Sequence, residues 1–102
     1  DLAQLGEALA ERPDYVAFGP IFATQSKHGA DPALGLARVA EAAALAHAAG
    51  VALVVIGGLT LAHAAALREH AVTAAVISDL TAGGTDGASI ARRAAAWQAA
   101  LA

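Results

Sequence analysis

The sequence predicts an α/β fold, namely the C-terminal part of a (β/α)8 barrel with three parallel strands and four helices. Three segments are apolar at nearly every position, which is typical of strands buried on both faces of a parallel sheet. A helix-forming segment lies between successive strands, as a parallel crossover requires. Each strand also ends in small or polar residues, as strands do where their carboxyl ends form a binding site.

The first helix is expected at residues 1–11, where leucines recur at helical spacing. Arg12, Pro13 and Asp14 follow, and the proline cannot continue a helix. The first strand is expected at residues 15–18, and it ends before Gly19 and Pro20.

The second helix is expected at residues 36–49, with Gly50 closing its carboxyl end. Its buried side is expected to contain Leu36, Val39 and Leu45. The second strand should occupy residues 51–56, which are rich in β-branched side chains.

The third helix is expected at residues 60–70, with Thr60 as its N-cap. The third strand should cover residues 72–77, and a glycine-rich loop should follow it. The last helix is expected at residues 88–101, capped by Asp86.

The length of the chain bears on the domain organisation. A complete (β/α)8 barrel usually needs about 250 residues, whereas this chain has 102 and begins without methionine. We therefore expect residues 1–102 to form one partial-barrel domain, from the helix before the sixth strand through the eighth helix, with the N-terminal half absent. The alternative fold is a small doubly wound sheet.

Composition excludes several classes of function. The formal charge of −3 provides no basic surface for nucleic acid. The absence of cysteine excludes disulfides and thiolate chemistry and is compatible with the cytoplasm, where we expect the protein. Residues 42–67 carry no formal charge, but glycines and histidines interrupt them. Helix, strand and helix explain this stretch better than a membrane span does.

Polar residues after the strands indicate a site for anions. Lys27 is the single lysine of the chain, and Thr24 and Ser26 lie beside it after the first strand. An ammonium group and two hydroxyls are suited to an oxyanion. Gly57–Gly58 and Ser78 follow the other two strands, where backbone N–H groups and helix N-termini can bind phosphate.

A family resemblance rests on three motifs, which read GPIFATQSK at residues 19–27, VVIGGLT at 54–60 and VISDL at 76–80. Together they resemble the C-terminal half of thiamine phosphate synthase, a TIM barrel. The resemblance implies a transferase that joins hydroxymethylpyrimidine diphosphate to thiazole phosphate, with Mg²⁺, and releases pyrophosphate. It also implies that the Mg²⁺ ligands belong to the N-terminal half, so no metal ligand is expected in this chain.

The resemblance assigns two groups of residues. The diphosphate of the pyrimidine substrate is expected to contact Thr24, Ser26 and Lys27, with Lys27 as the catalytic residue that stabilises the departing pyrophosphate. The thiazole phosphate is expected to bind backbone amides around Gly58, Ile77 and Ser78, which we call the phosphate cup.

Plainer interpretations stand beside these assignments. Lys27 could be a solvated loop residue, the two hydroxyls could cap a local turn, and Gly57–Gly58 could simply form a tight turn. Asp79 departs from the family, which commonly has alanine there, and its carboxylate would repel a phosphate unless it points away. The four histidines are expected on the surface: His28, His47, His63 and His70.

Two alternative functions remain open. The first is a thiazole tautomerase on the same barrel, although its characteristic histidine would stand at the position of Pro20. The second is a non-catalytic half-barrel that binds phosphate or associates with itself to cover its sheet edge. The expected partners are small phosphorylated substrates, with neither nucleic acid nor membrane, and with another copy or the missing half-barrel as a possible protein partner.

Overall fold

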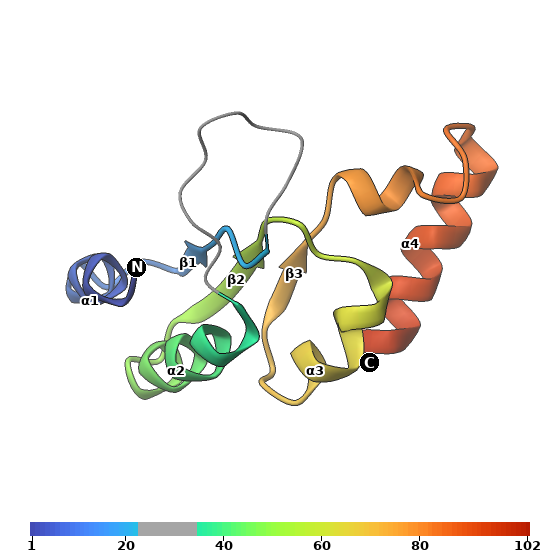
Figure 1. Ribbon diagram of the computed structural model, residues 1–102. Coiled ribbons are helices and arrows are strands. Elements are labelled where there is room, and N and C mark those ends of the chain that lie inside the picture. The colour runs from blue at the N-terminus through green and yellow to red at the C-terminus, as the bar shows by residue number, and fades with distance from the viewer. Residues whose placement is uncertain (23–34) are drawn as a thin grey trace.

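The computed structural model describes residues 1–22 and 35–102. Its elements in chain order are α1 (Leu2–Ala10), β1 (Tyr15–Phe18), α2 (Gly35–Ala48), β2 (Ala52–Ile56), the 3-10 helix η1 (Leu61–His63), α3 (Ala64–Arg68), β3 (Thr73–Ala75), the 3-10 helix η2 (Ser78–Thr81) and α4 (Gly87–Leu101). Figure 1 shows the arrangement of these elements. The described ranges thus contain the expected three strands and four α-helices.

The three strands form one parallel sheet in the order β1-β2-β3. Val55 in the central strand lies in register with Phe18 of β1 and Ala74 of β3. Because the strands are parallel, their carboxyl ends emerge at the same edge of the sheet, at the top of Figure 1.

The helix ends follow the signals in the sequence. Asp1 caps α1, because its carboxylate accepts a hydrogen bond from the Gln4 N–H at 2.9 Å. Gly50 follows α2 with a φ of +71°, the left-handed conformation that glycine adopts without strain. Asp86 caps α4 by accepting from the Ser89 N–H at 3.2 Å, as expected.

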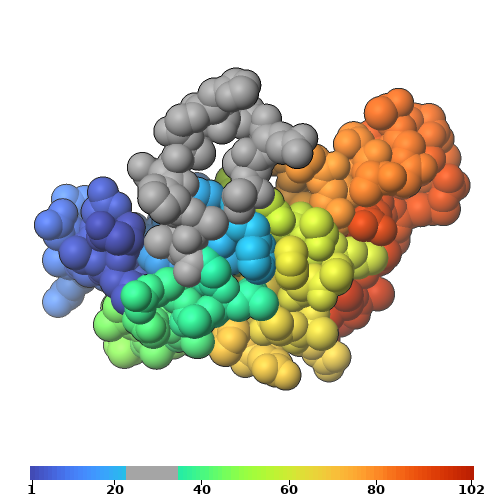
Figure 2. Space-filling view, viewed as in Figure 1, coloured from blue at the N-terminus to red at the C-terminus, as the bar shows by residue number. Residues whose placement is uncertain are grey.

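The helices cover one face of the sheet. The side chains of Val16, Phe18, Leu53 and Val55 are buried in the same core as residues of all four helices. The largest helix residues in that core are Leu5, Val39, Leu67 and Trp97. Each helix packs against the next one along the chain, and Figure 2 shows α1 in blue and α4 in red at opposite ends of this row.

The opposite face of the sheet is open, so the expectation that the strands are buried on both faces was wrong. Burial alternates along β1, where Tyr15 is 65% exposed and Val16 is buried. Ile56, at the end of β2, is 37% exposed. The physical reason is that the helices contribute side chains to one face, while the alternate strand residues point the other way.

The expectation for one residue of α2, Leu45, was also wrong. Leu45 is 45% exposed, whereas the buried residues of α2 are Val39, Ala42, Ala43 and Ala46. Leu45 follows Val39 by six positions, which turns it about 240° around the helix axis. The small alanines, and not Leu45, let α2 lie close against β1 and β2.

The third strand and third helix differ in extent from the expectation. The strand was expected over residues 72–77 but spans three residues, and its last pair is Ala75 with Ile56. The chain then leaves the ladder toward η2, which leaves Ile77 73% exposed. The helix expected at residues 60–70 is divided into η1 and α3, with Thr60 preceding η1 in extended conformation.

The uncharged stretch of the sequence divides among α2, β2, η1 and α3. Across residues 1–22 and 35–102, none of the helices has the length and apolar character needed to cross a bilayer.

The link between β2 and η1 depends on glycine. Gly57 has a φ of +104°, and a Cβ atom at this position would lie 2.6 Å from the Cα of Pro20. A side chain would therefore meet both backbone strain and a backbone collision.

We predict that Gly57→Ala lowers the free energy of unfolding by at least about 2 kcal/mol, because the alanine is strained in this conformation and its Cβ meets Pro20. The matched control is Gly6→Ala in α1, where a Cβ meets nothing within 4 Å. It should stabilise the helix by about 0.5–1 kcal/mol. Urea unfolding of both variants checks this, and equal stabilities would contradict the tight approach at Gly57.

Candidate functional site

The candidate site lies at the carboxyl ends of the strands. After β1, the chain runs beside the end of β2, because the Ile21 N–H donates to the Ile56 carbonyl and the Phe22 N–H donates to the Gly57 carbonyl, each at 3.0 Å. A Cβ on Gly19 would collide with the Ile56 carbonyl oxygen. Glycine at position 19 thus permits the two strand ends to approach closely.

The structure brings the three residues of the phosphate cup to neighbouring strand ends. Gly58 lies two residues beyond Ile56, and Ile77 lies two residues beyond Ala75, its partner in the ladder. Gly58 has a φ of +65°, and Ser78 begins η2 with its side chain exposed. Adjacent loops of a parallel sheet thus carry Gly58 on one side and Ile77–Ser78 on the other.

The other predicted contacts with substrate lie outside the described residues. Thr24, Ser26 and Lys27 were assigned to the diphosphate, and His28 was assigned to the surface; all four belong to residues 23–34. Their assignments stay predictions. The described backbone leads into this segment from Phe22 and leaves it at Gly35, whose N–H donates to the Ile21 carbonyl at 2.7 Å.

Asp79 is buried, and its carboxylate turns toward α4. Its Oδ1 accepts from the Arg93 Nη2 at 3.0 Å. Its Oδ2 accepts from the Trp97 Nε1 at 2.8 Å, from the Arg93 Nε at 3.2 Å and from the Leu61 N–H at 3.2 Å. This arrangement removes the like-charge conflict that the sequence suggested, because Arg93 pairs the carboxylate.

These contacts determine the charge state of Asp79. Burial by itself raises the pKa of the carboxyl, but hydrogen bonds from Arg93 and Trp97, the positive charge of Arg93 and the Leu61 N–H together hold the pKa below the ordinary value of 3.8. Asp79 is therefore ionised at neutral pH, inside a fully hydrogen-bonded arrangement.

His63 has a more specific place than the surface position expected from the sequence. Its ring stacks on Phe22 with the ring centres 4.0 Å apart, and it is half-buried. Its Nδ1 accepts a hydrogen bond from the Thr60 N–H at 3.0 Å, so the proton of the neutral ring is on Nε2. His63 thus joins the end of η1 to the segment after β1.

Metal ligands are scarce in the part of the chain that the structure describes. Residues 1–22 and 35–102 bring together no group of three or more histidine, cysteine, aspartate or glutamate side chains that could hold a metal ion. These residues therefore do not fit a complete Mg²⁺ site, and the prediction that Mg²⁺ binds residues of an N-terminal half stays a prediction.

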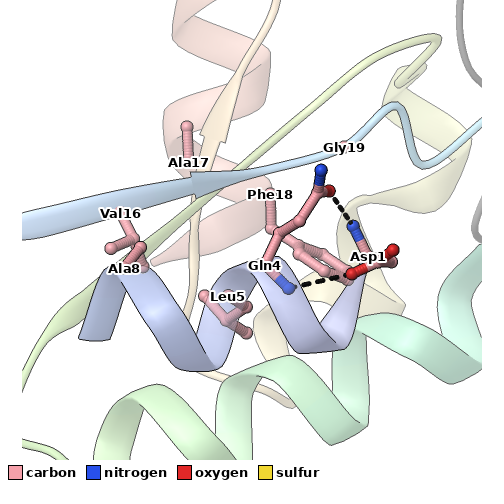
Figure 3. Close-up of a pocket in the computed structure, with 8 residues that line it drawn as sticks. All are labelled: Asp1, Gln4, Leu5, Ala8, Val16, Ala17, Phe18 and Gly19. Atoms are coloured by element: carbon pink, nitrogen blue, oxygen red, sulfur yellow. Dashed lines mark hydrogen bonds between the residues drawn. The ribbon is translucent and has the colours of Figure 1, made fainter. Parts of the chain in front are cut away.

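A hollow of about 250 Å³ lies between α1 and β1 (Figure 3). Side chains of α1 and β1 line it, and among them Leu5, Val16 and Phe18 are buried. Figure 3 shows the residues that line it, on α1 and along β1. None of the three residues of the phosphate cup lines this hollow.

Sequence reasoning missed the partners of Asp79. Arg93 and the single tryptophan, Trp97, are four residues apart on α4 and so share one helix face. Two side-chain donors on one face could have suggested a buried acceptor. The sequence did not indicate which acidic residue would meet them.

The geometry defines an α/β protein with a parallel sheet, whose loops at the carboxyl edge can form a site for an anion. The chain belongs to the thiamine monophosphate synthase family, whose model matches residues 1–80. That match includes all three strands and the whole predicted phosphate cup.

Several curated proteins are similar to this chain. A thiamine-phosphate synthase of Haemophilus influenzae is 45% identical over 84 residues, which is 79% of this chain and 35% of that protein. One of Anaeromyxobacter dehalogenans is 41% identical over 99 residues, covering 96% of this chain and 43% of that protein. A thiamine biosynthesis multifunctional protein of Corynebacterium glutamicum is 36% identical over 98 residues, covering 95% and 13%. The chain thus spans less than half the length of each of these relatives.

We predict that Asp79→Asn lowers the free energy of unfolding at neutral pH by about 3 kcal/mol, because it leaves Arg93 without its charged partner. The stabilisation by Asp79 is fully present above the ordinary pKa of 3.8 and is lost as the pH falls through the lower pKa of the folded state. The stability difference between wild type and variant should therefore shrink below a pH of about 4.

Denaturant unfolding at several pH values measures this difference. Trp97→Phe is a second variant, since it removes one donor but keeps the carboxylate. In it, the acid-induced loss should begin at a higher pH than in the wild type. A stability difference for Asp79→Asn that is independent of pH would show that the ionised carboxylate does not stabilise the fold.

Proposed function

We propose that the protein is a thiamine phosphate synthase, which joins hydroxymethylpyrimidine diphosphate to thiazole phosphate and releases pyrophosphate. The observation that carries the proposal is the pairing of β2 with β3 in a chain of this family, because the loops that follow these two neighbouring strands contain Gly58 and Ile77–Ser78. The names of the similar proteins support the same reaction.

In this proposal the phosphate cup holds the thiazole phosphate. Glycine at position 58 lets an anion approach the backbone, because no Cβ lies between them. The φ of +65° at Gly58 is conformationally easy for glycine alone. Amides of Ile77 and Ser78 would complete the cup from the neighbouring loop. Such a cup needs no positive side chain of its own, in agreement with the uncharged residues Gly58, Ile77 and Ser78, which would bind through their backbone amides.

The reaction requires stabilisation of a leaving group more than it requires a base. The C–O bond of the pyrimidine diphosphate breaks, the thiazole nitrogen forms the new C–N bond, and pyrophosphate leaves with the electron pair. We assign the stabilisation of pyrophosphate to Lys27, assisted by the hydroxyls of Thr24 and Ser26. The opposing phosphate cup would hold the nucleophile in line, which lowers the entropic barrier to the bond-forming step.

The proposal includes a (β/α)8 barrel to which this chain contributes three strands. Helices on one face and a sequential strand order support it, because a doubly wound sheet has helices on both faces. The exposed face of the sheet carries Tyr15 and Ile56, which would point into the barrel interior. Among the described strands β1 pairs with β2 alone, so its other edge could pair with a further strand.

Other parts of the proposal concern partners and place. The substrates are small phosphorylated molecules, and the N-terminal half of the barrel, or a second copy, is the expected protein partner. Mg²⁺ would neutralise charge on the diphosphate when bound. Because the described residues hold no complete metal site, no step here is assigned through it. The cytoplasm is the expected location.

We predict that Lys27→Ala in the full-length protein encoded by the gene lowers kcat for pyrophosphate release about 100-fold, because one donor to the leaving group is lost. The control is Arg38→Ala, which removes a cation paired with Glu41 on the surface of α2, at 2.8 Å. It should leave kcat within about twofold of the wild type.

The assay uses both substrates with Mg²⁺ and follows pyrophosphate. Pyrophosphate release by Lys27→Ala at the wild-type rate would remove Lys27 from the mechanism. No release by the wild type would refute the synthase function, and isomerisation of the thiazole phosphate by the same preparation would instead favour the tautomerase.

We predict that Gly58→Ala raises KM for thiazole phosphate about tenfold and leaves KM for the pyrimidine diphosphate unchanged, because a Cβ obstructs the phosphate cup. Gly50→Ala is the matched control, since its φ of +71° is close to the +65° of Gly58 while it lies at the end of α2. Steady-state kinetics of both variants separates obstruction from strain. Equal effects at both positions would contradict a role for Gly58 in binding.

A further inference from the structure

The phosphate cup consists of two loops that are separated in the sequence. One is the loop after β2, which contains Gly58 and continues to Leu61; the other is the loop after β3, which contains Ser78. Amides from two loops bind one phosphate well only if the loops keep a constant separation. A residue that joins both loops would determine that separation.

Asp79 makes that connection. It follows Ser78 directly in η2, and its Oδ2 accepts from the N–H of Leu61, the first residue of η1, at 3.2 Å. Leu61 is three residues beyond Gly58, and the intervening Leu59 is buried in the core. Asp79 therefore joins the two loops. Its carboxylate bonds to Leu61 in the chain after Gly58, and its backbone is linked directly to Ser78.

The carboxylate is itself held from a third element. Arg93 donates to both of its oxygens and also, through Nε, to the Asp79 backbone carbonyl at 3.3 Å. Trp97 donates to Oδ2 at 2.8 Å and is buried. These contacts fix both the backbone and the side chain of Asp79 against α4, so the Ser78 loop cannot shift against α4 without breaking several hydrogen bonds, and the Leu61 N–H ties the Gly58 loop to this fixed carboxylate.

We infer that Asp79 is a positioning residue for the phosphate cup, holding the Gly58 loop and the Ser78 loop at the separation that a phosphate needs. The inference rests on the proposed function, because it takes the cup as the site of the thiazole phosphate. Asp79 touches no substrate in this role; it acts through the backbone amides beside it.

The charge of Asp79 is compatible with an anion close by. The Asp79 carboxylate and the Arg93 guanidinium form an ion pair at 3.0 Å, so the pair has no net charge as seen from the cup. The side chain of Arg93 is 29% exposed and that of Asp79 is 5% exposed, which places the negative member inside. An alanine here would leave the Leu61 N–H, Arg93 and Trp97 without their shared acceptor.

The test measures the Kd of the thiazole phosphate by calorimetry with the full-length protein encoded by the gene. Asp79→Asn should raise this Kd about tenfold. It should also raise KM for thiazole phosphate while KM for the pyrimidine diphosphate stays within about twofold, a separation that general destabilisation does not produce. Arg93→Lys keeps the charge but loses the fork of donors, and it should raise the Kd by about threefold.

Asp86→Ala is the matched control. Asp86 is also an aspartate that hydrogen-bonds a backbone N–H, but it caps α4 and contacts Ser89 instead of the loop after β2. It should lower Tm and leave the Kd unchanged within about twofold. If Asp79→Asn fails to fold, Arg93→Lys carries the test by itself.

The outcomes separate this inference from the proposed function. A wild type that binds thiazole phosphate but releases no pyrophosphate would refute the synthase function. The Kd values of the variants would then still decide the positioning role of Asp79. A wild type that does not bind thiazole phosphate overturns the inference. So does an unchanged Kd in Asp79→Asn, or in Arg93→Lys where the first variant does not fold, and so does an equal rise in Kd for Asp86→Ala.

Discussion

The parallel pairing of β2 with both of its neighbours is the constraint on which the rest of the structure depends. Val55 lies between Phe18 and Ala74 and is fully buried, so a shift of one residue would turn the buried Leu53 and Val55 out of the core. The same pairing delivers three loops to one edge of the sheet. The candidate site is thus a consequence of strand register.

Close approach of backbones at that edge limits which residues can stand there. The Ile21 and Phe22 amides bond to carbonyls at the end of β2, and Gly19 and Gly57 occupy the two places where a Cβ would collide. The glycines of the motifs are therefore needed by the fold whether or not an anion binds. Gly58, next in the chain, combines a left-handed backbone with a place at the strand end, and it is the glycine whose freedom the proposed phosphate cup uses.

The two faces of the sheet differ, since only one of them is covered by helices. Alanines of α2 approach one face closely, while Tyr15 and Ile56 remain exposed on the other. Exposed apolar residues on a regular face are typical of a surface that meets another part of a protein. Among the described residues, Asp79 is the buried charged residue, and its ionised carboxylate is stable away from water because Arg93, Trp97 and Leu61 donate hydrogen bonds to it.

The sequence by itself determined the order of helices and strands, the cap at Asp86, and the family, because periodicity, capping and motifs are properties of short segments. It misplaced Leu45 and the end of β3, and it did not indicate the stacking of His63 on Phe22. Only the tertiary structure decided which sheet face the helices cover and where Asp79 points. Both depend on residues distant in the chain, such as Asp79 and Trp97, which meet because β3 and α4 pack against the same core.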